Sequence, residues 1–194
     1  MKKMLCLLAA VAVCLSWALA QPYAGKRFEF STAASVSNIK YADADDSTTI
    51  FNLHLRLGVF LWKGLQLEPE ILLTVPENDY GEDTTGVIFV GNILYNFNIA
   101  GKVVPFILAG AGYGNAQKLL SWAADWDAGI SVLNFGLGIK YFLSPSAALR
   151  IDYRFTTYSG TKTETYSYWG YTYSETYKLD RTDNEGTIGI SILF

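Results

Sequence analysis

The sequence predicts an all-β protein, a single eight-stranded antiparallel up-and-down transmembrane β-barrel. Apolar and polar residues alternate with a period of two over most of the chain, which indicates strands with one apolar and one polar face. There are eight such segments of about ten residues, the length that a tilted strand needs to cross a bilayer. Their connections are alternately short and long, as in a barrel whose turns and loops lie at opposite ends.

The first 20 residues form a separate targeting segment, and residues 21–194 form the barrel. Lys2 and Lys3 precede an apolar stretch from Leu5 to Leu15, and Ala18-Leu19-Ala20 has the small-residue pattern of a cleavage site. This organisation is typical of a secretory signal peptide, and the stretch is too short for a permanent transmembrane helix. A helical anchor and a lipidation site at Cys14 are the alternatives.

Removal of this leader leaves an acidic chain without cysteine. Cys6 and Cys14 both lie in the leader, so no disulfide or cysteine metal site is expected in the barrel. Without Lys2 and Lys3, the 15 basic residues become 13, which against 18 acidic residues gives a net charge of −5. An acidic chain offers no electrostatic basis for binding nucleic acid.

The clearest strand is Phe51 to Leu61, where apolar residues alternate with Asn52, His54 and Arg56. Leu65 to Val75 repeats the pattern with glutamates on its polar face. The other expected strands are Phe28 to Ile39, Val87 to Phe97, Val103 to Asn115, Leu133 to Leu143, Leu149 to Phe155 and Glu185 to Phe194. The pattern does not assign the two faces of Val103 to Asn115, because this segment is rich in glycine and alanine.

The expected connections fall into two classes. The short turns are Trp62-Lys63-Gly64, Asn98 to Lys102 and Leu143 to Ser146. The longer, polar or acidic loops are Ala42 to Thr48, Pro76 to Thr85, Ala116 to Asp127 and Thr157 to Asp183.

Two features predict that the polar face lines the interior and that the apolar face meets lipid. Aromatic residues gather near strand ends, as in the girdles of membrane barrels: Trp62, Tyr95, Phe97, Tyr141 and Phe142 near the turns, and Tyr41, Tyr113 and Tyr158 near the loops. The polar face carries four cations and four carboxylates, which can pair inside a narrow barrel. These eight charged residues and the single histidine form the expected lumen network: Glu29, His54, Arg56, Glu68, Glu70, Lys140, Arg150, Asp152 and Arg154. The solvated face of a soluble sheet is the alternative.

The segment from Thr161 to Lys178 is nearly symmetric about Trp169-Gly170, with alternating Tyr, Thr and Ser on both sides. It predicts a β-hairpin, at about residues 157–183, that extends the last two strands beyond the membrane. Aromatic side chains give contact area at low entropic cost, so the candidate recognition surface is Tyr166, Tyr168, Trp169, Tyr171, Tyr173 and Tyr177. A stiff hairpin without a binding role is the alternative.

The leader, the eight strands and the last residues together resemble the family of small outer-membrane β-barrels that includes OmpX and the barrel domain of OmpA. The resemblance covers roughly Lys26 to Phe194, with Leu67-Glu68-Pro69-Glu70, Ala109 to Gly114 and Asp152-Tyr153-Arg154-Phe155 as further similar segments. It implies a place in the bacterial outer membrane, in contact with its lipid. It also implies that the last strand carries the assembly signal for the barrel-insertion machinery, on Ile188, Ile190, Ile192 and Phe194.

The expected function is non-enzymatic. The surface loops would mediate adhesion to, or recognition of, an extracellular or host-surface partner, or the barrel would stabilise the envelope. No cofactor or metal is expected, since His54 is the only histidine and the acidic segments Asp43 to Asp46 and Glu77 to Asp83 lack EF-hand spacing. Two alternatives stay open: a narrow porin-like channel for small solutes, and a lipid-modifying enzyme that uses His54.

Overall fold

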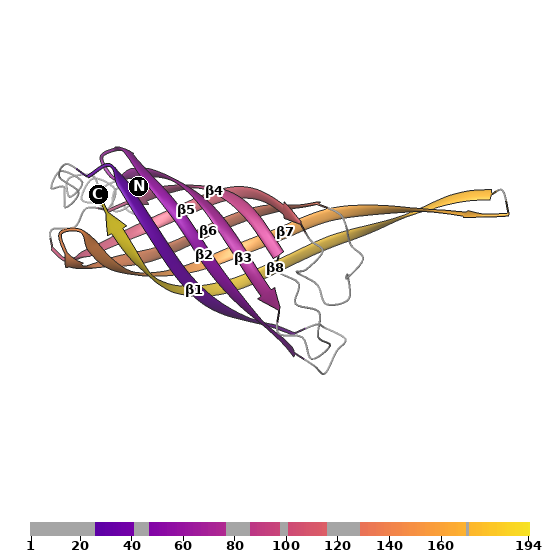
Figure 1. Ribbon diagram of the computed structural model, residues 1–194, viewed down its shortest axis with the longest axis horizontal. Helices are drawn as coiled ribbons and strands as arrows, with labels where there is room; N and C mark the ends of the chain where they lie inside the picture. Colours follow the sequence, from indigo (N-terminus) through magenta and orange to yellow (C-terminus); the bar gives the residue numbers. More distant parts are fainter. Residues whose placement is uncertain (1–25, 41–46, 77–85, 98–100, 116–128, 170) are drawn as a thin grey trace, which may run out of the picture.

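The computed structural model describes residues 26–40, 47–76, 86–97, 101–115, 129–169 and 171–194. Its strands are β1 (Phe28–Lys40), β2 (Ser47–Trp62), β3 (Leu65–Pro76), β4 (Gly86–Asn96), β5 (Val103–Asn115), β6 (Gly129–Ser144), β7 (Ala147–Tyr168) and β8 (Tyr171–Leu193). Each strand pairs antiparallel with the next, and β8 pairs with β1 to close a barrel (Figure 1). The predicted fold class is confirmed. The expected leader, Tyr41 and the two acidic segments lie outside the described residues.

Most strands are longer than the alternation alone indicated. β2 and β6 each begin four residues before the expected start, at Ser47 and Gly129. β7 and β8 have 22 and 23 residues, because they continue through residues 157–183, the long connection that was expected from the sequence to form a β-hairpin. They pair without interruption from Ala147 opposite Ile192 to Tyr168 opposite Tyr171. The two strands form a hairpin that projects far beyond the rest of the barrel (Figure 1).

The two faces of the sheet are inverted relative to a soluble barrel. Along β6, buried and exposed residues alternate over most of the strand. Leu133, Phe135 and Leu137 point outward and are exposed, whereas Asn134 and Lys140 point inward and are buried. An apolar exterior and a polar interior suit a barrel that is surrounded by lipid. Within the described residues, no helix is long and apolar enough to span a membrane.

The glycine-rich strand β5 follows the same alternation, although the sequence did not reveal it. Val104, Phe106 and Leu108 are buried inside the barrel, and Ile107 and Tyr113 are exposed outside it. Hydropathy fails as a signal here because both faces are apolar or made of small residues. The inward face of β5 is therefore apolar from Val104 to Leu108.

Two of the expected girdle residues lie inside the barrel. Phe142 and Tyr158 are buried, so their assignment to the girdles is wrong. The reason is strand parity: Tyr141 points outward, and its neighbour Phe142 must then point inward. Trp62, Tyr113 and Tyr141 are exposed at the outer surface, and the rings of Tyr95 and Phe97 pack edge to face, with centroids 5.0 Å apart.

The short turns lie at the end opposite to the hairpin (Figure 1). Lys63 and Gly64 connect β2 to β3 and have positive φ angles of 38° and 90°, as a two-residue type I′ turn requires. Pro145 and Ser146 connect β6 to β7 in a second tight turn. The two ends of the barrel therefore differ: one carries tight turns, and the other carries the hairpin.

Candidate functional sites: the lumen and the β7–β8 hairpin

An apolar layer fills the lumen near the short turns. It consists of Val104, Phe142, Ala148 and Leu193, with Phe60 packed against them. These side chains come from β2, β5, β6, β7 and β8, so the layer joins opposite walls of the barrel. These buried side chains fill the interior at the turn end.

The first charged layer above this apolar layer is built around Lys140. Its Nζ donates to Glu29 Oε2 at 2.5 Å and to Gln66 Oε1 at 3.1 Å. The same nitrogen lies 5.5 Å from the ring centroid of Phe106 and 5.6 Å from that of Phe60, within range of a cation–π contact. All five side chains are buried or partly buried, so the ammonium group depends on these partners in place of water.

Arg150 occupies the middle of the lumen and joins three strands. Its terminal nitrogens donate to both oxygens of Glu68, at 2.6 and 3.0 Å. Its Nε donates to Asp152 Oδ2 at 3.2 Å, and its guanidinium carbon lies 4.7 Å from the ring centroid of Phe106. A bidentate pair with a carboxylate is the strongest arrangement available to arginine, and here it is fully desolvated.

Two further arginines bind the carboxylates next to this pair. Arg154 Nε donates to Asp152 Oδ1 at 2.6 Å, and its NH1 donates to Glu70 Oε2 at 2.7 Å. Arg56 NH1 donates to the other oxygen of Asp152 at 3.1 Å. Asp152 is thereby surrounded by three guanidinium groups, those of Arg56, Arg150 and Arg154.

His54 lies between two carboxylates. Its Nδ1 is 2.5 Å from Glu70 Oε1, and its Nε2 is 3.3 Å from Glu185 Oε1. Glu185 also accepts hydrogen bonds from Asn52 Nδ2, at 2.6 Å, and from Ser35 Oγ. The Ser35 hydroxyl is itself 3.3 Å from His54 Nε2. Each ring nitrogen therefore has a carboxylate oxygen within hydrogen-bond distance.

One charged member of this network, Glu185, was not expected from the sequence, and neither were its neutral members, among them Ser35, Asn52 and Gln66. Within the described lumen, four cations face five carboxylates, so the expected equality of four and four is wrong. The signal was present in the sequence, because Glu185 shares the parity of Thr187 and Ser191 on the inward face of β8. Glu185 and Glu70 lie on either side of the His54 ring.

Buried apolar side chains return on the loop side of the charged layers. They come from β3, β4, β6 and β7 and are Leu72, Ile88, Val90, Ile130, Val132 and Tyr158. The lumen is thus layered, with apolar side chains on both sides of a charged centre. Among the described residues, no cluster of histidine and carboxylate side chains has the arrangement of a metal site. This interior is suited to holding the barrel wall together.

The hairpin beyond the barrel has two chemically different faces. Register pairs Tyr166 with Tyr173 and Tyr168 with Tyr171 on one face, and the rings of Tyr166 and Tyr173 stack with centroids 5.1 Å apart. The opposite face is a ladder of paired hydroxyl groups, Thr163–Thr176, Thr165–Ser174 and Ser167–Thr172, at 3.1 to 3.4 Å. We call the first the tyrosine face and the second the hydroxyl face.

The candidate recognition residues lie at or near the tyrosine face and the tip. Trp169 and Tyr171 are 85% and 81% exposed, and Tyr173 and Tyr166 are 57% and 38% exposed. Tyr177 shares the tyrosine face by register, but its side chain and that of Tyr168 lie outside the described side chains. Trp169 has a positive φ of 51°, which places it in the turn itself.

The comparison with protein families settles the identity of the fold. A model of the outer membrane protein beta-barrel domain matches residues 6–189. The chain belongs to this outer-membrane β-barrel family. Three solved barrels of this kind are similar in structure, at 12 to 15% sequence identity. No curated protein sequence matches the chain.

The similar structures cover nearly the whole barrel. Neisserial surface protein A has a TM-score of 0.57 at 13% identity, over 86% of this chain and 97% of that one. The N-terminal barrel of Pseudomonas aeruginosa OprF has a TM-score of 0.52 at 12% identity, over 87% and 98%. P. aeruginosa OprG has a TM-score of 0.50 at 15% identity, over 88% and 96%. At these identities the likeness concerns the fold.

Membership of the outer-membrane barrel family places the protein in the bacterial outer membrane and its exposed apolar face against lipid. The four residues of the expected assembly signal point outward on this face: Ile188, Ile190, Ile192 and Phe194 are all more than half exposed. The Phe194 ring stacks on Phe28 across the β1–β8 pairing, with centroids 5.9 Å apart. All nine residues of the expected lumen network are buried inside.

Proposed function

We propose that this outer-membrane barrel is a non-enzymatic anchor whose β7–β8 hairpin binds a partner outside the cell. The observation that supports the proposal is the tyrosine face, where large aromatic side chains are exposed on a stiff, fully paired ribbon. Exposed aromatic residues on a preorganised scaffold bind with little loss of entropy. In such barrels the short turns face the periplasm and the longer connections face outward, which directs the hairpin away from the cell.

The layered lumen supports the role of an anchor. Charged pairs and apolar layers link the walls of the barrel, so the wall supports the hairpin rigidly at its base. A two-stranded hairpin alone is marginally stable in water. Continuity of β7 and β8 with the barrel wall supplies the support that an isolated hairpin lacks.

A truncation tests the proposal. Residues 161–178 are replaced by Asn-Gly, which joins Gly160 to Leu179 at positions that already pair and favours a tight turn. We expect the truncated protein to keep heat-modifiable electrophoretic migration, the mark of a folded barrel, and to lose adhesion to host cells or to immobilised surface components. Normal adhesion by the folded, truncated protein would show that the hairpin is not the binding element.

Matched variants on the two faces sharpen this test. Tyr166, Tyr171 and Tyr173 are changed together to Thr in one variant, which keeps β-propensity. Thr163, Thr165 and Thr176 are changed together to Val in the control variant, which alters the hydroxyl face instead. We expect adhesion to fall in the first variant only. An equal fall in both would assign no special role to the tyrosines. Unchanged adhesion in both, with impaired envelope integrity, would favour the alternative role in envelope stability.

One observation favours a second candidate, a hydrolytic enzyme. Ser35 Oγ, the His54 ring and Glu70 form a chain of contacts like that of a nucleophile, a base and an orienting acid. Two features oppose this reading. The Ser35 hydroxyl donates its hydrogen bond to Glu185 and not to His54. All these groups also face the lumen, whereas a lipid substrate lies outside the wall.

Removal of the His54 imidazole distinguishes the binding protein from the hydrolytic enzyme. For His54→Ala we expect an unchanged envelope lipid profile by mass spectrometry, since the histidine then serves only to hold Glu70 and Glu185. A lipid species that disappears in both His54→Ala and Ser35→Ala, with the barrel still folded, would instead establish an enzyme.

A further inference from the structure

The tyrosine face of the hairpin carries the same pair of side chains twice. On β7, Glu164 lies two residues before Tyr166. On β8, Glu175 lies two residues after Tyr173. Register places the two tyrosines directly opposite each other, and likewise the two glutamates. The ribbon therefore brings two Tyr–Glu pairs together, and we call these four residues the Tyr–Glu patch.

The side chains of the Tyr–Glu patch lie close to one another. The Tyr166 hydroxyl donates to Glu164 Oε2, and the rings of Tyr166 and Tyr173 stack with centroids 5.1 Å apart. Tyr173 and Glu175 are both exposed. Two residues along a strand span about 7 Å, and opposite residues have Cβ atoms about 5 Å apart. A single ligand group can therefore reach both carboxylates and the aromatic stack.

The position of the two glutamates points to a positively charged ligand. Like charges directly opposite each other on one face of a sheet destabilise the pairing of the strands. A cation between Glu164 and Glu175 would remove this repulsion. The neighbouring tyrosine rings attract the same cation, because the π-system of an aromatic ring is negative on its face.

An arginine side chain combines these two contacts, and the lumen of this protein contains an example. The guanidinium carbon of Arg150 lies 4.7 Å from the ring centroid of Phe106. The same group donates to both oxygens of Glu68, at 2.6 and 3.0 Å. A guanidinium is planar and carries five N–H donors at its edge, so it stacks on a ring and binds carboxylates at the same time. The ammonium group of lysine is a compact point charge without a planar face.

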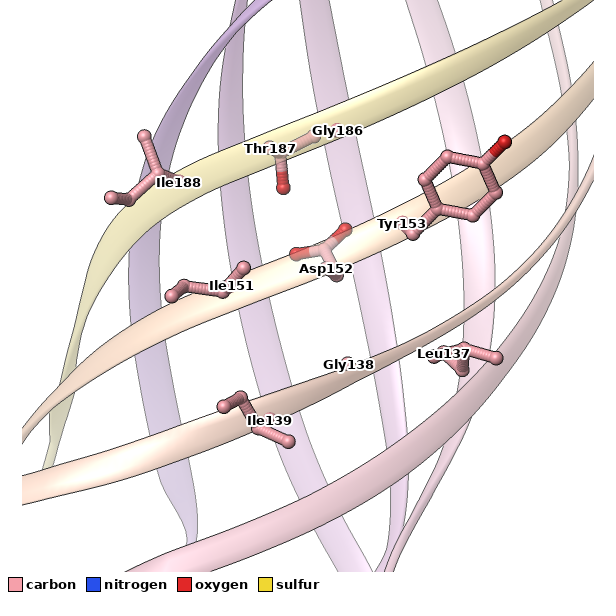
Figure 2. Close-up of a pocket in the computed structure, with 9 residues that line it drawn as sticks. All are labelled: Leu137, Gly138, Ile139, Ile151, Asp152, Tyr153, Gly186, Thr187 and Ile188. Carbon is pink, nitrogen blue, oxygen red and sulfur yellow. The ribbon is translucent and has the colours of Figure 1, made fainter.

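The Tyr–Glu patch does not belong to the lipid-facing side of β7. In the barrel wall, Ile151 and Tyr153 are exposed on the outer surface, and Asp152 between them is buried (Figure 2). Side chains alternate along a strand, so Glu164 and Tyr166 share the parity of Asp152. The hairpin also projects far beyond the barrel (Figure 1). A ligand of the patch therefore comes from the aqueous medium.

The acidity of the hairpin end favours a basic partner. The hairpin and the connections on its side of the barrel are residues 40–46, 77–85, 116–128 and 157–183. They contain 13 of the 18 acidic residues and five of the 15 basic residues, which gives a net charge of −8. Charge of one sign at a binding surface steers a partner of the opposite sign towards it.

We propose that the Tyr–Glu patch binds an arginine side chain of a polypeptide outside the cell. The guanidinium group stacks on Tyr173 and donates to Glu164 and Glu175. This inference rests on the proposed binding role of the hairpin and specifies the partner as a polypeptide that presents arginine on its surface.

Fluorescence anisotropy tests the patch. The folded protein in detergent is titrated against a fluorescent glycine–serine peptide with arginine at alternate positions, and against matched peptides with lysine or uncharged citrulline in place of arginine. We expect the arginine peptide to bind most tightly, the lysine peptide more weakly and the citrulline peptide not at all. Glu164→Gln with Glu175→Gln removes both charges and keeps polar side chains of the same size. It should weaken binding of the arginine peptide about fivefold.

Asp43→Asn with Asp45→Asn is the matched control, because it removes two negative charges from the segment between β1 and β2. This variant should bind the arginine peptide like the wild type. The proposal is wrong if the citrulline and arginine peptides bind equally, or if the control loses as much affinity as the glutamine variant. It is also wrong if phosphocholine displaces the peptide more strongly than arginine amide does, which would assign the patch to a choline headgroup.

The adhesion assay distinguishes failure of this inference from failure of the proposed function. Normal adhesion by the glutamine variant, with loss of adhesion in the tyrosine variant, would show that the hairpin binds its partner without an arginine contact. Normal adhesion by the folded, truncated protein would instead reject the hairpin as the binding element.

Discussion

At the scale of single residues, the lumen is a set of charges that depend on one another. Glu68 receives both of its hydrogen bonds from Arg150, and neither side chain reaches solvent. A buried charge that loses its partner is costly, whereas replacement of the whole pair by apolar side chains is often nearly neutral. Loss of one charged member should therefore lower the stability of the barrel more than replacement of a whole pair.

We expect Arg150→Met to destabilise the barrel by about 3–5 kcal/mol, because it leaves Glu68 buried without its cation. The measurement is the free energy of unfolding in urea for protein refolded in micelles. The double variant Arg150→Met with Glu68→Met should recover much of this loss, and Lys102→Met, at an exposed position, should change little. A single variant as stable as the wild type would contradict the network described here.

The inward position of most polar residues could be predicted from parity, because a charge every second residue indicates a polar face whatever its environment. Pairing could not be predicted in this way. Arg150 and Arg154 lie two residues from Asp152 on the same strand, so parity alone brings them to it. The contact of Asp152 with Arg56 crosses the lumen from β2 to β7, and alternation does not determine it. Phe142 and Tyr158 were misassigned because closeness to a strand end was given more weight than parity.

At the scale of elements, tight turns fix the register of neighbouring strands. Gly64 closes the β2–β3 turn at a φ of +90°, and a Cβ there would lie 2.3 Å from Asn96 O. Its carbonyl accepts hydrogen bonds from the backbone and the side chain of Asn96. This turn thus also holds the end of β4.

Gly64→Ala should lower the free energy of unfolding by about 1–3 kcal/mol, through left-handed strain and the contact with Asn96 O. Gly101→Ala is the matched control. Gly101 also has a positive φ, of 134°, but nothing lies within 4 Å of its added Cβ. We expect the urea midpoint to fall further for Gly64→Ala than for Gly101→Ala, and equal midpoints would show that Asn96 O moves away freely.

The sequence indicated the type of each element better than its length. β3 and β5 agree closely with the expected ranges, because charged or turn-forming residues mark their ends. β7 and β8 exceed the strand ranges that alternation alone indicated, because they run on without interruption into the hairpin expected over residues 157–183. Composition therefore does not mark where the membrane-spanning part of a strand gives way to its extension.

At the scale of the whole molecule, the filled lumen argues against the channel alternative. Apolar side chains lie on both sides of the charged layers, and an eight-stranded barrel has an interior just wide enough for side chains. We expect no steady conductance when the purified protein is added to a planar bilayer. Discrete, long-lived channel openings would contradict this expectation and would favour a narrow pore.

Pairing around the barrel is uneven. β1 pairs with β8 only from Glu29 to Ser35, whereas β7 pairs with β8 along its whole length, from Ala147 to Tyr168. Local opening follows the weakest cooperative unit, so β1 and β8 should be the first neighbouring strands to separate. Under mechanical load or mild denaturant, the barrel should unzip along the β1–β8 boundary while the β7–β8 hairpin stays intact. The strand that carries the binding element is also the strand along which the wall first separates.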